Sequence, residues 1–212
     1  HWSVLPSFRW ASPIQEAIKL WKKETWLTIM YMSEGMDEWD ILRIEKVIVD
    51  NIDKTQDIFN KFEKIWPDLL YRTLKDLLAW KMFWIKQDTR KATYCKKISK
   101  EDWLVKFKTS SAFDIYNIFR AYSNWPGIYS NYNWKKLNIE DCSYSKGWDF
   151  ETDITEKLIP WWVIKINKKT IWLVCSDKKL LILNQVKLEW KKSMDIISFI
   201  NGNKDFLNYT FE

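Results

Sequence analysis

Alternating apolar and polar residues near the start of the chain predict a β-hairpin. Apolar and polar residues partly alternate over residues 25–32, residues 41–49 form a second strand-like run, and residues 33–40 between them form a loop with several acidic residues. Two such runs on either side of a polar segment are typical of a hairpin. The acidic segment 33–40 is therefore expected to lie at its tip.

Helical patterns stand on both sides of this hairpin. The segment 12–15, Ser-Pro-Ile-Gln, has Ser at the N-cap, Pro at the first helical position and Gln at N3, which is typical of a helix start. After the hairpin, apolar residues recur at helical spacing in two stretches. We expect one helix capped by Asp53 or Thr55, and a second helix from Pro67 to about Ala79.

In the second half of the chain, short strand-like runs alternate with turns. A helix is expected to start at Ser110 or Ser111 and to end before the segment 125–127, and a final helix is expected from about Ser193 to Ile200. The strand-like runs between these helices are 128–132, 136–142, 162–166, 171–175 and 180–187. Short strands in this number suggest a small β-barrel.

The length and composition suit a globular protein. With 212 residues, of which 47% are hydrophobic, the chain can form one large domain or two small ones. No apolar run approaches the ~18 residues of a membrane span, and we find no signal peptide. The first residue is His rather than Met, which indicates a chain cut at its N-terminus. Cys95, Cys142 and Cys175 fit no zinc pattern, and their odd number and wide spacing favour a reduced, cytoplasmic protein.

The chain is basic, and the excess charge is concentrated in one stretch. The formal net charge is +6 and the pI is near 9.0, which suits a polyanionic partner, although a solvated lysine surface is the commoner cause. Residues 81–100 contain seven Lys or Arg residues and one Asp. Such a stretch can follow the phosphates of a nucleic acid by a sequence-independent attraction. For any single lysine, a solvated side chain is still the more common situation.

Four motifs in the first 42 residues resemble those of the folate-dependent formyltransferases, and most closely the branch that acts on initiator methionyl-tRNA. In this chain they read HWSVLP (1–6), RWASPIQ (9–15), ETWLTIM (24–30) and EGMDEWDIL (34–42). Two later segments also resemble the family, KATYCKKISKED (91–102) and KKSMDIISFINGN (191–203). The resemblance therefore extends over nearly the whole chain.

The tryptophans are the main departure from this family pattern. Those that stand where the family has glycine are Trp2, Trp10, Trp26 and Trp39. The chain has 16 Trp and 4 Gly, whereas glycine usually makes up about 7% of a protein. Trp21, Trp66 and Trp80 stand at predicted helix ends, and Trp134 follows Asn133 in a predicted hairpin turn, all of which favour glycine. We hypothesise that most tryptophans, Trp125 excepted, stand for glycine, as when a UGA codon for glycine is read as tryptophan. The alternative is a genuinely tryptophan-rich protein.

The resemblance implies an α/β fold. It would be the C-terminal half of a Rossmann-like formyltransferase domain, followed by an OB-like β-barrel domain. The catalytic part would span residues 1–85, the basic linker residues 86–102, and the C-terminal tRNA-binding domain residues 103–212. About half of the Rossmann-like domain would then lie upstream of His1, since the strands and crossover helices that complete an α/β domain are not in the sequence.

A lone histidine is usually a surface or structural residue, but the motif around His1 is where the family has its catalytic histidine. By the same resemblance Asp37 is its carboxylate partner, and the catalytic Asn, two positions before the histidine, lies outside the chain. An imidazole can donate a hydrogen bond to an oxyanion and can move protons, and a nearby ionised carboxylate favours its protonated form. The backbone of Ser33, Glu34, Gly35 and Met36 would line the folate site, and for Glu34 a solvated acidic turn is an equal alternative.

The function implied by the resemblance is transfer of a formyl group from 10-formyltetrahydrofolate to the amino group of initiator methionyl-tRNA. It needs no metal, and the enzyme would be a cytoplasmic monomer. Contacts with tRNA are expected from Lys96, Lys97 and Lys100 in the linker, and from Arg120, Lys135 and Lys136 in the C-terminal domain. One alternative is an amino-sugar N-formyltransferase, which shares the fold and the folate. Another is a non-catalytic RNA-binding fragment, since residues 1–212 alone are expected to be inactive.

Overall fold

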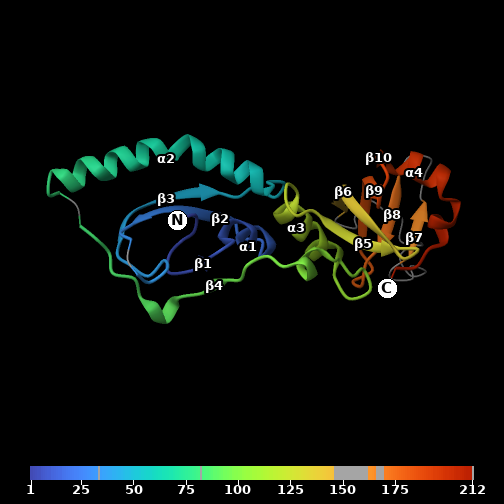
Figure 1. Ribbon diagram of the computed structural model, residues 1–212, viewed down its shortest axis with the longest axis horizontal. Helices are drawn as coiled ribbons and strands as arrows, with labels where there is room; N and C mark the ends of the chain where they lie inside the picture. The colour runs from blue at the N-terminus through green and yellow to red at the C-terminus, as the bar shows by residue number, and fades with distance from the viewer. Residues whose placement is uncertain (33, 82, 146–161, 166–169, 212) are drawn as a thin grey trace. The chain divides into compact units, whose positions relative to one another are not determined.

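The computed structural model describes residues 1–32, 34–81, 83–145, 162–165 and 170–211 (Figure 1). The chain divides into two compact units, His1–Ser99 and Lys100–Glu212. Ser33 and Ile166, which lie in the predicted acidic loop and in one predicted strand, are outside the described residues. Among the described helices, none is long and apolar enough to cross a membrane.

In its described residues, the first unit combines a parallel pair of strands, an antiparallel pair of strands and two α-helices. Its elements are β1 (Arg9–Trp10), α1 (Pro13–Lys19), β2 (Glu24–Met30), β3 (Ile41–Ile48), α2 (Thr55–Leu78), a 3₁₀ helix (Thr89–Lys91) and β4 (Tyr94–Cys95). The strands β2 and β3 pair antiparallel, so the predicted hairpin is confirmed, with the acidic loop between them. The strands β1 and β4 pair parallel, which brings the start of the chain beside the basic linker.

Helix α1 begins where the sequence predicts. Ser12 is the N-cap and Pro13 is the first helical residue, and the buried face is formed by Ile14, Ala17 and Ile18. The hydroxyl of Ser12 does not cap the helix but donates to the carbonyl of Lys96 at 2.8 Å. The cap position is therefore used to bind the linker segment to the helix start.

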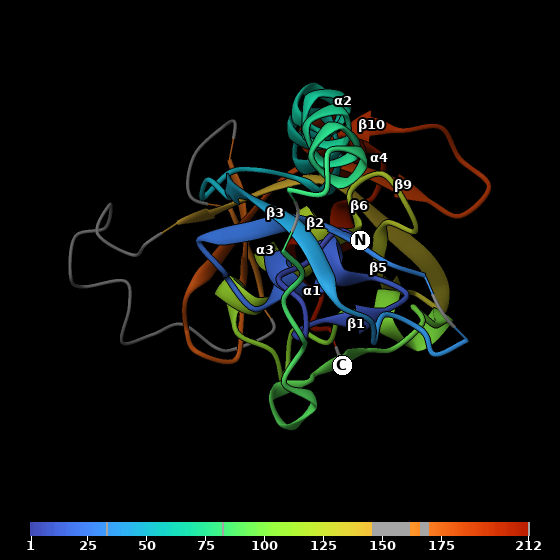
Figure 2. The same cartoon turned by 90° about the vertical axis from the view of Figure 1, so that its left-hand side faces the viewer.

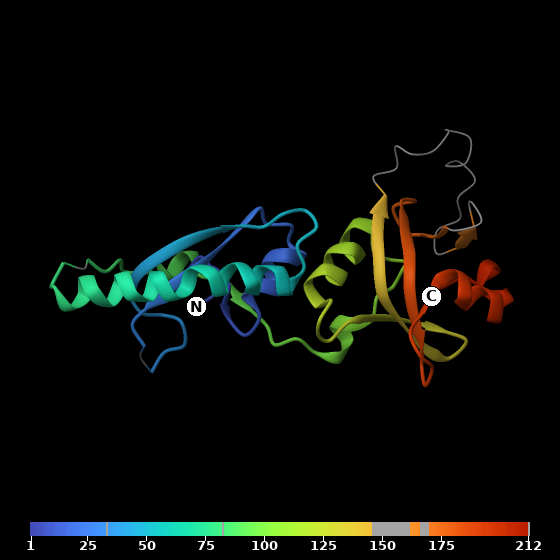
Figure 3. The ribbon, with the colours of Figure 1, turned by 90° about the horizontal axis from the view of Figure 1, so that it is seen from above.

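The prediction of two helices after the hairpin is wrong, because α2 is one continuous helix of 24 residues. It runs along the β2–β3 hairpin (Figures 2 and 3) and contacts both strands. Pro67 lies inside the helix and has no N–H to donate to the preceding turn. Ile58 and Phe62 before it and Leu69 and Thr73 after it are all buried, so packing on both sides holds the helix together across the proline.

The predicted caps of this helix are also wrong, since the N-cap is Lys54 rather than Asp53 or Thr55. The main-chain N–H of Lys54 donates to the carboxylate of Asp57 at 2.8 Å, which is one half of a capping box. Asp53 instead accepts from the N–H of Asp50 at 2.7 Å and closes the preceding turn.

The second unit is an antiparallel sheet with helices at its sides. Its elements are α3 (Ala112–Tyr122), β5 (Ile128–Tyr132), β6 (Lys135–Ser145), β7 (Val163–Lys165), β8 (Ile171–Val174), β9 (Leu180–Leu188), β10 (Met194–Asp195) and α4 (Ile196–Gly202), with 3₁₀ helices at Lys100–Trp103 and Lys204–Asn208. The described strands pair in the order β5-β6-β9-β8-β7, and β10 pairs with β9. Figure 3 shows β6 and β9 side by side as the longest pair of this sheet.

Three sequence expectations for this unit have different outcomes. Helix α3 starts as predicted, with Ser111 as the N-cap accepting from the N–H of Asp114. The last helix starts at Ile196 rather than near Ser193, because residues 194–195 pair with β9 and Asp195 caps the helix. A closed barrel is not shown, since β5 and β7 are the two ends of the described strand order and no described pairing joins them.

Left-handed backbone at tryptophan is a recurrent feature of both units. The described tryptophans with positive φ are Trp10 (82°), Trp21 (52°), Trp80 (55°), Trp134 (64°) and Trp190 (62°). This backbone region favours glycine, and a bulky side chain there is strained. The positions of Trp21, Trp80 and Trp134 in turns that favour glycine agree with the sequence expectation. The expectation of a helix end at Trp66 is wrong, because this residue lies inside α2.

Candidate active site

His1 is attached to strand β2 through its main chain. Its amino nitrogen donates to the carbonyl of Thr28 at 2.6 Å, and the N–H of Thr28 donates back to the carbonyl of His1 at 2.8 Å. The Thr28 hydroxyl, which is buried, donates to the carbonyl of Ser3 at 2.6 Å. The His1 backbone is therefore fixed on the edge of β2, and its ring is placed by what it contacts next.

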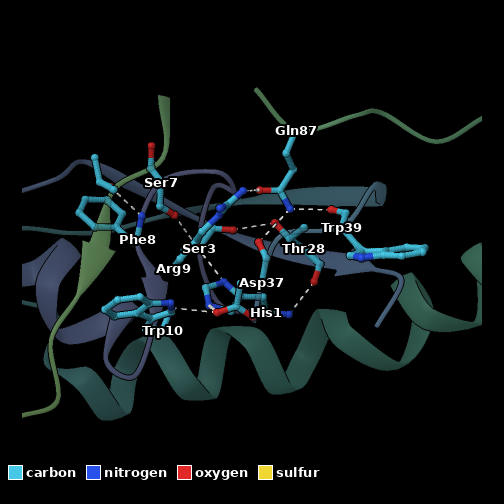
Figure 4. A network of polar contacts seen from close by, with 11 residues as sticks. His1, Ser3, Ser7, Phe8, Arg9, Trp10, Thr28, Asp37, Trp39 and Gln87 are labelled. Atoms are coloured by element: carbon cyan, nitrogen blue, oxygen red, sulfur yellow. Dashed lines mark hydrogen bonds and ion pairs between the residues drawn. The ribbon is translucent and has the colours of Figure 1, made fainter. Parts of the chain in front are cut away.

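Ser3 holds one nitrogen of the His1 ring (Figure 4). The Ser3 Oγ lies 2.9 Å from His1 Nδ1 and donates to the carbonyl of Ser7 at 2.7 Å. A hydroxyl has one proton to give, and here Ser7 receives it. Nδ1 of His1 is therefore assigned as the donor to Ser3, from the hydrogen-bond network.

Asp37 faces the other nitrogen of the ring. Its Oδ2 atom lies 3.2 Å from His1 Nε2 and accepts a hydrogen bond from the main-chain N–H of Trp10 at 2.8 Å. Both side chains are nearly buried, since 10% of His1 and 12% of Asp37 remain exposed. With Nδ1 already a donor, a neutral ring would present the Nε2 lone pair to the carboxylate. The arrangement therefore fits the doubly protonated imidazolium.

The contact with Asp37 does not satisfy the hydrogen-bonding capacity of Nε2. It is buried and makes no well-aligned hydrogen bond within the described part of the chain, although Asp37 is near. A cavity of about 610 Å³ lies beside the ring, between β2 and α2. Its lining is mostly apolar and includes Trp2, Met30, Phe62 and Leu70. A protonated nitrogen next to an apolar cavity is suited to bind a developing negative charge on a ligand.

A buried pair, Arg9 and Gln87, lies behind the Asp37 loop. The Arg9 guanidinium donates to Gln87 Oε1 at 2.9 Å, and the Gln87 amide donates to the main-chain carbonyls of Asp37 and Trp39 at 3.0 and 2.6 Å. In the sequence, Arg9 stands out only as part of a motif, and Gln87 does not stand out at all. No local signal distinguishes that glutamine from other polar residues of the basic linker.

The predicted folate-lining residues belong to the loop between β2 and β3. Ser33 lies outside the described residues, while Glu34 and Met36 are exposed and Gly35 is partly buried. A Cβ at Gly35 would lie 2.8 Å from Glu38 Oε2, so a side chain there requires movement of that flexible carboxylate. None of Glu34, Gly35 and Met36 is among the residues that line the cavity beside His1.

The predicted RNA-contacting residues do not all lie on the surface. Lys96, Lys97, Lys100 and Lys135 are exposed, and the Lys136 ammonium lies 4.3 Å from the centre of the Tyr129 ring. Arg120 is 1% exposed, and its guanidinium donates to Asn117 Oδ1 at 3.1 Å within helix α3. The expectation that Arg120 contacts RNA is corrected on this ground, because its charged group is enclosed by the unit itself.

In the part of the chain that the structure describes, no group of three or more His, Cys, Asp or Glu side chains is arranged to hold a metal ion. The three cysteines are buried and form no disulfide with one another. Burial raises the pKa of the Cys95 thiol to about 12, with a further contribution from nearby Glu16. Burial also raises the pKa of the Cys175 thiol, so both sulfurs are neutral at ordinary pH.

Comparison with known proteins gives the same assignment for both ends of the chain. A family model described as formyl transferase matches residues 1–74, and one described as formyl transferase, C-terminal domain, matches residues 97–204. A methionyl-tRNA formyltransferase of Lachnospira eligens is 34% identical over 205 residues, which cover 96% of this chain and 64% of the relative. The chain thus spans less than two thirds of the length of that curated relative.

Solved structures share the fold at lower identity. HypX from Aquifex aeolicus in complex with tetrahydrofolic acid has a TM-score of 0.68 at 14% identity and covers 98% of this chain and 34% of its own. WlaRD, a sugar 3N-formyl transferase, has a TM-score of 0.61 at 16% identity and covers 91% of this chain and 65% of its own. At these identities the likeness concerns the fold alone.

Proposed function

The chain belongs to the formyl transferase family, and from this premise we propose that the full-length protein formylates the amino group of initiator methionyl-tRNA with 10-formyltetrahydrofolate. The observation that carries the proposal is the 34% identity to a methionyl-tRNA formyltransferase over 96% of the chain. Its site would contain His1 and Asp37, whose facing atoms are 3.2 Å apart.

The chemistry requires a donor at the formyl oxygen. When the amine of the methionyl group attacks the formyl carbon, negative charge grows on that oxygen, and the amine must lose a proton. Nε2 of His1 would donate its hydrogen to the oxygen, because it has no well-aligned partner among the described residues and His1 is one of the residues that line the cavity. Removal of one such donor typically costs about a hundred- to a thousandfold in rate.

Asp37 would keep the His1 ring protonated and correctly turned. Its carboxylate attracts the Nε2 proton, while Ser3 holds Nδ1 at the opposite side of the ring. After the attack, the His1 imidazolium can give its Nε2 proton to the departing folate nitrogen, and the neutral imidazole that remains can take the proton that the amine loses, a role worth about a hundred- to ten-thousandfold. The roles of both residues belong to the proposal.

The folate would enter beside the loop between β2 and β3. The cavity next to His1 has a mostly apolar lining and about 610 Å³ of space, which suits an aromatic ring system. The backbone of Glu34, Gly35 and Met36 is the proposed wall on the loop side. When bound, the folate supplies the formyl group, and the residues of this chain bind and orient it.

We further propose that the second unit is the OB-like domain that contacts tRNA. A cavity of about 720 Å³ in this unit is lined by Lys106, Lys108, Asn131, Asn133 and Tyr209 among others. Lys135 and Lys136 lie on the adjoining strand β6, and Lys96, Lys97 and Lys100 come from the linker. Lysines beside aromatic and amide side chains are the chemistry that RNA-binding surfaces use.

The assay that tests the function offers the full-length protein two acceptors with the same folate donor. Charged initiator tRNA is expected to be formylated, and a nucleotide-linked amino sugar is expected to remain unmodified. The second acceptor is chosen because WlaRD, with a related fold, is a sugar formyl transferase. Product on the sugar alone would replace the proposal by the amino-sugar alternative. Binding of tRNA with no product on either acceptor would favour a non-catalytic RNA-binding protein.

A further inference from the structure

Gln87 connects three segments of the first unit that meet beside His1 and Asp37. It lies after helix α2, in the stretch that leads to β4, and only 7% of its surface is exposed. Its Nε2 donates to the carbonyl of Asp37 at 3.0 Å and to the carbonyl of Trp39 at 2.6 Å. Its Oε1 accepts from Arg9 at 2.9 Å. Both donors and the acceptor of this amide are therefore occupied.

The orientation of the Gln87 amide follows from its partners. Both groups on one side are carbonyl oxygens, which only accept, and the group on the other side is a guanidinium, which only donates. If the amide were turned over, its oxygen would face the two carbonyl oxygens and its NH₂ group would face the guanidinium, so none of the three hydrogen bonds could form. Arg9 is 1% exposed and stands on β1, so it fixes this orientation from the interior of the unit.

The loop that carries Asp37 needs such an anchor. Asp37 has φ of 60°, a left-handed conformation that a non-glycine residue adopts at a cost of about 1 kcal/mol or more. Its neighbours Met36, Glu38 and Trp39 are exposed and do not hold the loop by packing. Hydrogen bonds from Gln87 to the carbonyls of Asp37 and Trp39 hold the peptide groups that follow these two residues. These contacts use main-chain atoms only, so they do not depend on the side chain at position 39.

We propose that Gln87 is a positioning residue for the formyl transfer, acting through the backbone of the loop to keep the Asp37 carboxylate against the His1 ring. Arg9 supports it by fixing the amide. This inference rests on the proposed function. It assigns to a linker glutamine a share in the catalytic geometry, although its side chain contacts neither His1 nor the Asp37 carboxylate.

The test compares Gln87→Met and Gln87→Glu with the wild type in the full-length protein. Methionine has a similar length but cannot form the hydrogen bonds of the amide. Glutamate has the same shape, but a carboxylate oxygen, which only accepts, stands in place of the NH₂ group that donates to the two carbonyls. We expect kcat to fall about 10- to 100-fold, as for a small misplacement of a catalytic group, with KM for methionyl-tRNA changed little. Gln185→Leu, at an exposed glutamine of β9, is the matched control and should keep wild-type kinetics.

A second readout separates positioning from stability. If His1 acts as the imidazolium, kcat should fall at alkaline pH as the ring loses its proton, and this part of the pH profile of kcat, its alkaline limb, reports that loss. With Asp37 released, this limb should move to lower pH, and a merely structural residue would leave it in place. Unchanged kcat and an unchanged limb in folded Gln87→Met would overturn the inference. Lack of activity in the wild type would instead reject the proposed function, so the two failures are distinguishable.

An independent observation, the left-handed tryptophans, supports a second inference. Trp21 and Trp80 each follow the C-cap residue of a helix, and the same pair of hydrogen bonds is formed at both places. Trp21 N–H donates to Ile18 at 3.0 Å and Lys22 N–H to Ala17 at 2.9 Å. The bonds at the end of α2 are Trp80 N–H to Leu77 at 3.1 Å and Lys81 N–H to Asp76 at 2.9 Å. This is the Schellman motif, whose left-handed position is usually glycine.

Trp134 occupies the corresponding place in a hairpin. Asn133 and Trp134 join β5 to β6 with φ of 47° and 64°, the pattern of a type I′ turn in which Asn-Gly is preferred. The side chains of Trp80, Trp134 and Trp190 are almost wholly exposed, so packing does not compensate for their strain. We infer that the protein made in its own cells carries glycine at positions 10, 21, 80, 134 and 190, through a UGA codon that specifies glycine there.

Peptide mass spectrometry of the protein isolated from its own cells, together with its coding sequence, tests this inference. Glycine and UGA are expected at the five positions, and tryptophan with a UGG codon is expected at position 125, which is the internal control. The backbone of Trp125 does not have a positive φ, and its ring packs against that of Trp103 with the ring centroids 6.0 Å apart. Tryptophan at these five positions would overturn the inference.

Discussion

Asp37, in the loop between β2 and β3, has its Oδ2 atom 3.2 Å from Nε2 of His1. The same oxygen accepts the main-chain N–H of Trp10 at 2.8 Å, and the backbone of Asp37 is held by Gln87. The carboxylate is therefore fixed by contacts that do not involve the histidine. Such prior placement means that the ring need not reorganise the loop when charge develops nearby.

Replacement of Asp37 by Asn should lower kcat of the full-length protein by about a hundredfold or more, because a neutral amide no longer favours the imidazolium. Steady-state formylation of methionyl-tRNA measures the effect. Glu38→Gln is the matched control, since it removes a neighbouring, half-exposed carboxylate that lies 3.5 Å from Arg9. Equal losses in the two variants would mean that general loop charge, and not the His1 contact, is responsible.

Replacement of Ser3 by Ala should weaken the hold on the His1 ring. The variant loses the acceptor for Nδ1, and the expected cost is about 1 kcal/mol, close to a fivefold fall in kcat. Ser7→Ala is the control, because Ser7 takes part through its main-chain carbonyl, which that variant retains. A Ser3→Ala enzyme with unchanged kcat and an unchanged pH profile would argue against this role.

The sequence could predict what depends on local pattern. The hairpin, the start of α1 at Ser12 and the start of α3 after Ser111 follow from alternation and capping residues a few positions apart. The pairing of His1 with Asp37 came from a family motif and not from spacing. What could not be predicted depends on distant partners: Gln87 bonds to residues about 50 positions earlier, and Pro67 continues a helix because buried side chains flank it. The burial of Arg120 likewise depends on how the second unit packs around helix α3, which the local sequence pattern does not show.

The buried thiols predict a definite pH behaviour. The pKa of Cys95 is raised from 9.0 to about 12 by burial, so at pH 8 the folded protein carries ~1,000-fold less thiolate at this site than an unfolded chain. Reaction with a disulfide reagent at pH 8 should therefore be slow in the folded protein and fast in denaturant. Mapping of the labelled peptides identifies the site. Rapid labelling of Cys95 without unfolding would contradict its burial.

The same shift has a consequence for stability at alkaline pH. Because the folded-state pKa is raised, the contribution of Cys95 to the free energy of unfolding is complete below pH 9 and is lost as pH rises from 9 toward 12. Denaturant melts at several pH values measure this slope. Cys95→Ala should flatten it, and an unchanged slope would assign the alkaline loss of stability to other groups.

Replacement of Lys136 by Ala should weaken tRNA binding in a salt-dependent way. The ammonium lies 4.3 Å from the Tyr129 ring centre and 5.4 Å from that of Trp103, beside the lysines of the adjoining cavity. Because the variant neutralises one phosphate fewer, the slope of log K against log salt concentration should fall in magnitude by about 1. Lys64→Ala on α2, an exposed lysine outside the proposed contacts, is the control. The same slope in both variants would remove Lys136 from the interface.

Replacement of Trp134 by Gly should stabilise the protein. Glycine relieves the left-handed strain at the second position of the Asn133–Trp134 turn, and the exposed indole gives up no packing. We expect a gain of about 1 kcal/mol in the free energy of unfolding and a rise in Tm of about 2–4 °C. Trp125→Gly is the opposite control, because it removes a ring that packs against Trp103 and adds backbone freedom, so it should lower Tm. If Trp134→Gly also lowered Tm, the indole would be contributing contacts that outweigh the strain of its backbone, and the argument that this turn was built for glycine would fail.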